Sequence, residues 1–163
     1  MPPLTEAGFK DTDGRPHVPT LIQTGPTLQV IVLPASAETA PKLSDQVSAW
    51  PALIDTGASE SCIDNELAKS LGLTQIDVIA ISGVGGMQNH PVYLCSILIP
   101  SLNIAQYGRF AGVNLAVGGQ THRVLLGRTF LNGTIMIYDG IRGQVTLASP
   151  SIILPPPSIS LAQ

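Results

Sequence analysis

Short runs of apolar residues, separated by turn-forming residues, recur along most of this chain. Apolar or alternating runs that are bounded by Gly, Pro, Asn or Asp are typical of β-strands. The pattern predicts strands at residues 28–33, 52–55, 76–81, 92–99, 109–117, 124–126, 135–138 and 144–147. The chain is therefore expected to fold as a mostly antiparallel all-β domain, with a long hairpin between residues 76 and 99.

One segment has the spacing of a helix instead. Residues 65–71 place Leu67 and Leu71 on one face, with Asp64 before them and Gly72 after them. Aspartate is a favoured helix N-cap, and glycine is a favoured residue just beyond a helix end. The sequence therefore predicts one short helix here, and a single further helical turn near residue 130.

The two ends of the chain differ from its middle. Residues 1–18 are polar and turn-rich and are interpreted as a loose N-terminal arm, whereas residues 151–163 are interpreted as a Pro-rich tail. Residues 19–150 are expected to form one domain. Residues 152–154 (Ile-Ile-Leu) leave two alternatives open, a terminal strand at a dimer interface or part of a disordered tail.

Composition supports a folded domain and excludes some classes of function. Hydrophobic residues make up 44% of the chain and charged residues 12%, whereas disordered chains are poor in apolar residues. Aromatic residues reach only 4%, so the core is expected to be aliphatic. A net charge of −3 without a basic run argues against a nucleic-acid partner. No stretch has membrane-spanning length and no signal peptide is visible, so a soluble cytoplasmic protein is expected.

Metal and thiol chemistry are not expected. Cys62 and Cys95 are isolated in the sequence and are interpreted as two buried thiols in a reducing compartment. His17, His90 and His122 are scattered and are interpreted as surface histidines. No metal site and no cofactor follow from this pattern.

Three segments carry the candidate chemistry, and their order along the chain is informative. They are residues 53–58 (Leu-Ile-Asp-Thr-Gly-Ala), 81–86 (Ile-Ser-Gly-Val-Gly-Gly) and 124–128 (Val-Leu-Leu-Gly-Arg). Taken alone, the first is compatible with an ordinary strand-ending turn, the second with a simple hairpin tip and the third with a helix start. Trp50, just before the first segment, is expected to pack in the core.

In this order, the three segments resemble those of the retropepsin-like aspartic proteases, the family of retroviral proteases and their bacterial and cellular relatives. The resemblance covers roughly residues 27–148, and the helix after Asp64 is more similar to bacterial and cellular members than to viral ones. It implies a closed, mostly antiparallel β-barrel with one helix. It also implies an aspartic endopeptidase that hydrolyses peptide bonds and binds peptide or protein substrates.

The count of Asp-Thr-Gly turns predicts the assembly. Hydrolysis by this family needs two adjacent carboxylates that share one proton, and this chain contains the tripeptide once, at Asp55. Asp139-Gly140 lacks the threonine and is expected to be a hairpin turn, and Asp13-Gly14 lies in the polar arm. The sequence therefore predicts a homodimer in which each subunit contributes one Asp55.

The resemblance also implies roles for the residues around Asp55. Thr56 would hydrogen-bond across to the partner chain, Gly57 would let the substrate backbone approach, and Ala58 and Ser59 would complete the supporting turn. A mobile flap would close over the peptide, and its residues would be Ile81, Ser82, Gly83, Val84, Gly85 and Gly86. Cleft and structural roles fall to Leu125, Leu126, Gly127 and Arg128.

One position departs from the viral pattern. Viral members carry an acidic residue after Asp-Thr-Gly-Ala that pairs with the arginine of the third segment, and here that position is Ser59. Three partners of Arg128 stay open: Glu60, backbone carbonyls and the partner subunit. The cleft-lining residues implied by resemblance are Val84, Arg123, Leu125 and Cys62, and an arginine there would suit acidic or polar groups.

Two rival functions remain beside the protease. The same fold could serve as a non-catalytic peptide-binding or dimerisation module, because a fold does not determine a function. Alternatively, the N-terminal arm could cover the cleft of an inactive precursor.

Overall fold

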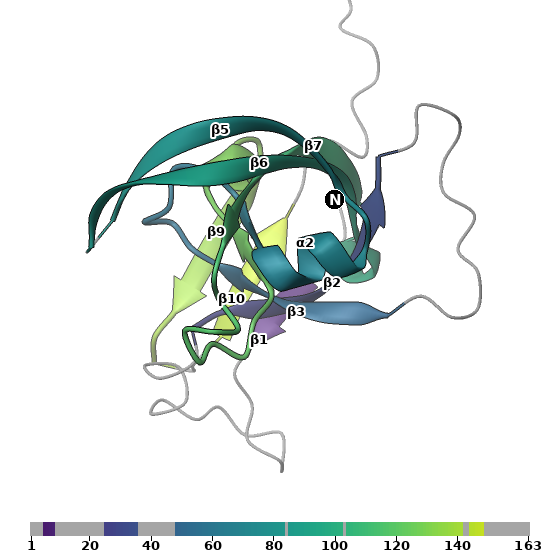
Figure 1. The fold of residues 1–163 in the computed structure, drawn as a ribbon. Helices are drawn as coiled ribbons and strands as arrows, with labels where there is room; N and C mark the ends of the chain where they lie inside the picture. Colours follow the sequence, from purple (N-terminus) through teal and green to yellow (C-terminus); the bar gives the residue numbers. More distant parts are fainter. Residues whose placement is uncertain are drawn as a thin grey trace, which may run out of the picture.

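Strands make up most of the fold, as the sequence pattern predicts (Figure 1). The structure is a computed structural model, and it describes residues 5–8, 25–35, 48–83, 85–102, 104–141 and 144–148. Its elements are β1 (Thr5–Gly8), β2 (Thr27–Pro34), β3 (Ala49–Ile54), β4 (Cys62–Asp64), α2 (Asn65–Ser70), β5 (Thr74–Gly83), β6 (Gly86–Ile99), the 3₁₀ turn η1 (Pro100–Leu102), β7 (Ile104–Val113), β8 (Val124–Leu126), α3 (Arg128–Leu131), β9 (Ile135–Asp139) and β10 (Gln144–Ala148). The expected all-β class is confirmed.

Seven strands form one sheet in the order β2-β3-β8-β4-β7-β6-β5. A further pairing of β2 with β6 joins the two sides of this sheet, so six of its strands form a continuous ring and β5 lies outside it. The pairs β3–β8 and β4–β7 are parallel, and the other pairs in the sheet are antiparallel. The expected, mostly antiparallel arrangement is therefore confirmed.

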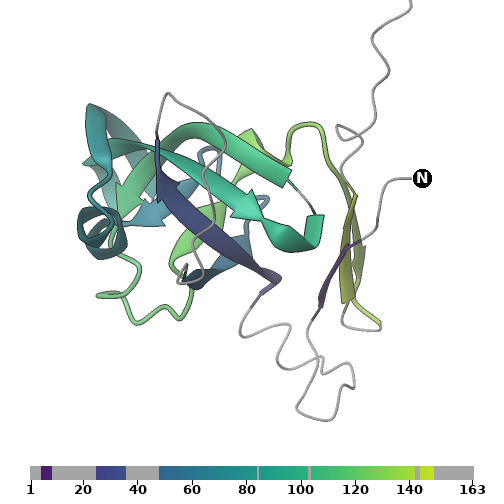
Figure 2. The same ribbon diagram turned by 90° about the vertical axis from the view of Figure 1, so that its right-hand side faces the viewer.

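A second sheet of three strands, in the order β1-β10-β9, stands beside the first (Figure 2). Its hairpin of β9 and β10 turns at Gly140, as the Asp139-Gly140 pair predicts. The sequence pattern does not predict β1, because residues 5–8 (Thr-Glu-Ala-Gly) show no apolar alternation. These residues form a strand by backbone pairing with β10, from Thr5 opposite Leu147 to Gly8 opposite Gln144. The expected loose arm therefore contains a strand.

The long hairpin predicted between residues 76 and 99 is present as β5 and β6, and it extends well beyond the ring of strands (Figure 1). Gly83 pairs with Gly86 at its tip, and Gly86 has a φ of 89°, a conformation that glycine adopts at little cost. Val84 lies outside the described residues. A bulge between Gln75 and Asp77 interrupts the pairing near the base of the hairpin.

The core is mainly aliphatic, as the scarcity of aromatic residues predicts. Its fully buried side chains include Val30, Ile63, Ile97, Leu126 and Leu147. Trp50 packs against this cluster from the side, as expected. Because Val145 and Leu147 of β10 belong to the same cluster, the small sheet shares one hydrophobic core with the large one.

The helix α2 begins and ends as the sequence predicts. Asp64 is its N-cap and accepts hydrogen bonds from the backbone N–H groups of Glu66 and Leu67, both at 3.2 Å. Leu71 caps its C-terminal end, and Gly72 follows with a φ of 63°. The further helical turn expected near residue 130 is α3.

Two further expectations about the fold need correction. The strand expected at residues 109–117 begins earlier, because β7 starts at Ile104 and ends at Val113, where its ladder to β4 ends. His122 is buried, with 6% of its surface exposed, and is not a surface histidine. The expected tail, including residues 152–154, and most of the expected arm lie outside the described residues. Among the described residues, no helix is both long enough and apolar enough to cross a bilayer.

Candidate active site

Asp55 stands directly after β3, at the point where a pair of parallel strands ends. β3 pairs with β8 from Ala52 to Ile54, and the backbone N–H of Asp55 continues this ladder to the carbonyl of Leu126 at 3.0 Å. The side chains of Ile54 and Leu126 are buried in the core. Burial of both strands therefore fixes the position from which Asp55 projects.

The turn after β3 holds one oxygen of the Asp55 carboxylate. Its Oδ1 atom accepts hydrogen bonds from the backbone N–H groups of Gly57 at 2.8 Å and Ala58 at 3.2 Å. The Oδ2 atom makes no hydrogen bond to any residue that the structure describes. Asp55 is half-buried, whereas Thr56 and Gly57 are exposed. The turn thus orients the carboxylate and leaves one of its oxygens available.

Space in this turn is limited. A Cβ atom at Gly57 would lie 3.1 Å from Oδ1 of Asp55, which is closer than ordinary van der Waals contact. The glycine therefore lets the backbone N–H approach the carboxylate closely. Thr56 is exposed, and its hydroxyl makes no hydrogen bond within the described part of the chain.

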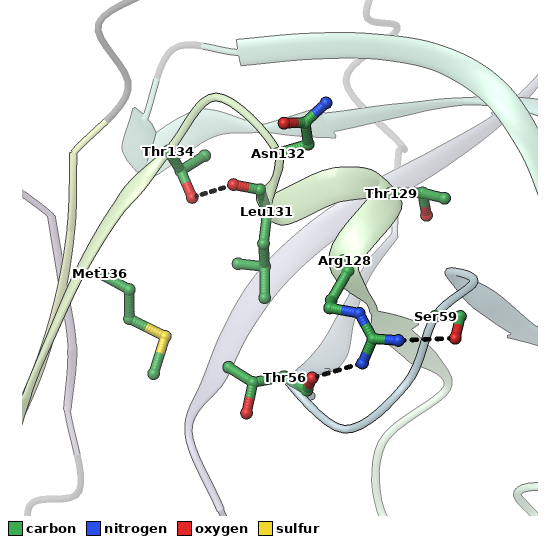
Figure 3. A pocket seen from close by; sticks show the side chains of 8 residues that line it. All are labelled: Thr56, Ser59, Arg128, Thr129, Leu131, Asn132, Thr134 and Met136. Atoms are coloured by element: carbon green, nitrogen blue, oxygen red, sulfur yellow. Dashed lines mark hydrogen bonds between the residues drawn. The ribbon is translucent and has the colours of Figure 1, made fainter.

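Arg128 ties the third sequence segment to the first (Figure 3). Its Nη1 donates to the carbonyls of Thr56 at 3.0 Å and Gly57 at 3.1 Å, and its Nη2 donates to Oγ of Ser59 at 2.7 Å. Of the three partners left open by the sequence, backbone carbonyls are therefore present. The described residues contain no ion pair between Arg128 and Glu60.

The buried Ser61 hydroxyl and the exposed Thr129 hydroxyl support the same junction. Ser61 and Thr129 share a hydrogen bond of 2.9 Å between their Oγ and Oγ1 atoms, and the Thr129 hydroxyl also accepts from the Ser61 N–H at 2.9 Å. Oγ of Ser61 accepts from the N–H of Gly127 at 3.1 Å. The sequence gives no signal for this pair, since isolated Ser and Thr residues are common next to turns.

Gly127 sits where no side chain fits. A Cβ atom there would lie 2.4 Å from the carbonyl oxygen of Glu60 and 3.0 Å from that of Ala58. Both neighbours are backbone atoms and cannot rotate away. The close approach lets the N–H of Arg128 reach the carbonyl of Ala58 at 2.9 Å.

An open hollow lies beside the Asp55 turn (Figure 3). Its volume is about 620 Å³, and one wall is made by the turn while another is made by α3 and the start of β9. The lining residues are Thr56, Ser59, Arg128, Thr129, Leu131, Asn132, Thr134 and Met136.

The hairpin tip stands apart from the other two segments. Ser82, Gly83, Gly85 and Gly86 are exposed, and Ile81 is half-buried. Within the described residues, the tip makes no hydrogen bond to the Asp55 turn or to α3. The structure therefore brings the first and third segments into contact and leaves the second projecting.

Two buried groups close to Asp55 have shifted titration. Burial lowers the pKa of His122, and the Arg123 charge lowers it further, while the Asp55 charge opposes both. Burial raises the pKa of the Cys62 thiol to about 11, with contributions from the negative charges of Glu60 and Asp55. Cys62 is buried and its thiol donates to the carbonyl of Glu60 at 3.6 Å, so it does not line an open cleft as the resemblance implied.

The remaining chemistry of the described residues is limited. Cys62 and Cys95 are both free and buried, as expected, and burial raises the pKa of Cys95 to about 12. Thiols with such values stay protonated near neutral pH and are poor nucleophiles. No group of three or more His, Cys, Asp or Glu side chains in the described ranges could hold a metal ion.

Comparisons with known proteins identify a matching family and similar folds. A family model described as "Aspartyl protease" matches residues 41–130. A retropepsin-like aspartic protease from Rickettsia conorii has a similar fold, with a TM-score of 0.53 and 14% identity over 90% of this chain and 91% of that one. No curated protein matches the sequence.

Weaker structural similarities extend to two other proteins. The EIAV protease in complex with the inhibitor HBY-793 has a TM-score of 0.45 and 19% identity over 65% of this chain and 84% of its own. The retroviral protease-like domain of Ddi1 from Leishmania major has a TM-score of 0.39 and 19% identity, over 79% of this chain and 97% of that domain.

Proposed function

This chain belongs to the aspartyl protease family, and we propose that it is an aspartic endopeptidase that acts as a homodimer with one Asp55 from each subunit. The observation that carries the proposal is the state of the Asp55 carboxylate. Two backbone N–H groups hold Oδ1, and Oδ2 is free of hydrogen bonds to the described residues. A held carboxylate with one available oxygen suits a group that must bind water or a second carboxylate.

The mechanism follows from the chemistry of two adjacent carboxylates. Repulsion between two negative charges makes it unfavourable for both groups to ionise, so the pair holds one proton between them. The ionised member takes a proton from water, which then attacks the peptide carbonyl, and the protonated member donates to the oxygen that becomes negative. This shared proton predicts a bell-shaped dependence of the rate on pH.

A second copy of the chain is needed, because one chain supplies one such turn. A two-fold axis would place each Asp55 against its equivalent. The exposed Thr56 hydroxyl, which has no partner among the described residues, is free to hydrogen-bond across that axis. The hollow beside the turn offers room for side chains of the second copy.

The edge of the small sheet supports such an assembly. Among the described strands, β9 pairs with β10 alone, so no other described strand lies along its second edge. Ile135, Ile137 and Tyr138 on this strand are more than half exposed, at 58%, 57% and 52%. Exposed apolar side chains along a free strand edge favour pairing with another strand. The proposed occupant is β9 of the second subunit.

The hairpin of β5 and β6 is proposed to act as the flap. Its exposed glycines, Gly83, Gly85 and Gly86, allow movement of the tip. Closure would exclude water and offer backbone hydrogen bonds to the substrate. Leu125, half-buried next to Leu126, is proposed to contact the bound peptide.

The direct test is replacement of the proposed catalytic group. The Asp55→Asn variant keeps the size and the hydrogen-bond acceptor of the side chain but cannot serve as the base. It should retain its fold and its dimer while losing cleavage of a proteome-derived peptide library. Substantial residual cleavage by this variant would overturn the proposal, and peptide binding without cleavage by the natural chain would favour a binding module.

A mixing experiment tests the contribution of two subunits. When natural and Asp55→Asn chains are unfolded, mixed in equal amounts and refolded together, about a quarter of the dimers should contain two Asp55 residues. Activity should then fall to about a quarter of that of the natural chain alone at the same total concentration. A fall to only half would indicate that each chain works by itself.

A further inference from the structure

Arg123 has a buried donor atom that has no hydrogen-bond acceptor among the described residues. Its Nη1 is buried, and no acceptor lies within hydrogen-bond distance of it in the described residues. A guanidinium stays charged at any pH a protein tolerates, so loss of a proton cannot remove the need for an acceptor. Buried donors in native proteins are nearly always satisfied, and an exception calls for an explanation.

The backbone places Arg123 on one face of the strand pair that carries Asp55. The N–H of Arg123 donates to the carbonyl of Pro51, and its carbonyl accepts from the N–H of Asp64, both at 2.8 Å. These bonds continue the ladder of β8 by one residue. Val124 and Leu126 point into the core, with no exposed surface.

Because side chains alternate along a strand, Arg123 and Leu125 point to the face opposite the core. The same alternation applies to β3, where Ala52 and Ile54 are buried. Leu53, which is opposite Leu125 in the parallel register, and Asp55 therefore share that outer face. The outer face thus carries Arg123, two leucines and the proposed catalytic carboxylate.

The distance along this face suits contact with a bound peptide. Arg123 lies at the level of Pro51, four residues before Asp55, which is a separation of about 13 Å between backbones. The side chains of Arg123 and of a substrate Asp or Glu can together span part of this distance. A peptide bound in extended form would thus present to Arg123 a side chain close to the bond under attack.

No described residue forms an ion pair with Arg123. The ion pair found within the described residues joins Arg109 to Asp77, at 2.6 Å, and involves neither Arg123 nor Asp55. The charges of Asp55 and Arg123 both act on the buried ring of His122, with opposite effects on its pKa. Both charges are therefore close to one buried side chain, although they are not paired with each other.

We propose that Arg123 is a specificity-determining residue that binds a carboxylate of the substrate, and that the enzyme favours an Asp or Glu side chain within about two residues of the cleaved bond. A carboxylate can accept two parallel hydrogen bonds from a guanidinium, which satisfies the orphan donor and the unpaired charge together. This inference rests on the proposed peptidase function.

The test measures binding apart from cleavage. Peptides in which the scissile bond is replaced by an uncleavable reduced amide are made in matched pairs, with Glu or Gln at one position and a blocked C-terminus. Dissociation constants are measured by calorimetry. The natural chain should bind the Glu peptide about ten- to a hundredfold more tightly than the Gln peptide at one position near the bond.

Three variants test whether the preference for the Glu peptide depends on Arg123. Arg123→Gln should abolish the preference for Glu, and Arg123→Lys, which keeps the charge without the fork of donors, should retain part of it. Lys69→Gln is the matched control, because it removes one exposed positive charge on α2 and should leave the preference unchanged. Circular dichroism and sedimentation verify that each variant is folded and assembled.

Several outcomes would overturn the inference. They are equal affinity for the Glu and Gln peptides at every position, a preference that survives Arg123→Gln, and absence of binding by every peptide. If the same peptides with a free C-terminus bound more tightly while the Glu and Gln forms bound equally, the site would bind chain ends and not side chains, and the inference would also be overturned. Cleavage of the normal peptides by the natural chain, but not by Asp55→Asn, separately decides the proposed function.

Discussion

Arg128 donates a hydrogen bond of 2.7 Å to the hydroxyl of Ser59, across 69 residues of sequence. In the viral proteases that the sequence resembles, an acidic residue at this position pairs with the arginine. Here Ser59 offers a neutral acceptor in place of that ion pair. Arg128 also donates two hydrogen bonds to the turn, to the carbonyls of Thr56 and Gly57. The turn is therefore held mainly through its backbone.

This arrangement predicts unequal effects of two substitutions. Arg128→Gln removes three hydrogen bonds and should lower the free energy of unfolding by about 1–3 kcal/mol, whereas Ser59→Ala removes one and should cost about 0.5–1 kcal/mol. Urea denaturation monitored by circular dichroism measures both. Equal losses for the two variants would contradict the dominant role of the backbone carbonyls.

The close packing at Gly127 predicts a large effect of one methyl group. Gly127→Ala would place a carbon 2.4 Å from a backbone oxygen, so the turn or α3 must shift. We expect a loss of about 1–3 kcal/mol in unfolding free energy, together with reduced peptidase activity. Gly83→Ala is the matched control, because nothing lies within 4 Å of a Cβ there, and its unfolding midpoint should stay near that of the natural chain.

Asp64 is expected to be the most sensitive acidic residue for stability. It is 1% exposed, and its two oxygens accept four backbone N–H bonds: Oδ1 from Glu66 and Leu67, and Oδ2 from Leu115 and Ala116. Asp64→Asn replaces one acceptor with a donor that faces two N–H groups. We expect a loss of about 2–4 kcal/mol by denaturant titration.

An exposed aspartate provides the contrast to Asp64. Asp77→Asn alters a surface ion pair with Arg109 and should leave the unfolding midpoint almost unchanged. A similar midpoint for the Asp64 and Asp77 variants would argue that the buried network does not stabilise the fold.

The buried His122 predicts a loss of stability in acid. Burial lowers the pKa of its ring below the value of 6.5 expected in the unfolded chain. As the pH falls, the unfolded chain therefore binds a proton at His122 more readily than the folded chain. The contribution of this group to the free energy of unfolding keeps its full value above pH 6.5 and decreases below it. Unfolding free energy measured from about pH 7 to about pH 5 should fall less steeply in His122→Gln than in the natural chain. Parallel curves would show that His122 does not contribute.

The sequence by itself determined the elements whose signals are local. Alternating apolar runs predicted the strands, Asp64 and Gly72 predicted both ends of α2, and the glycines near residue 85 predicted the hairpin tip. The order of three short segments also predicted the family, which the match to residues 41–130 confirms. Each of these signals depends on a few neighbouring residues, because side-chain period and backbone preference act over one or two turns of chain.

Tertiary structure decided what depends on residues far apart. β1 has no apolar pattern and exists because β10 offers its edge, nearly the whole chain away. The contacts from Arg128 to Ser59, the burial of His122 and the outward direction of Arg123 arise when β3, β4 and β8 come together. The identity of a residue does not determine which face of a sheet will be covered. That is decided by the packing of distant segments, which excludes water from one face and leaves the other open.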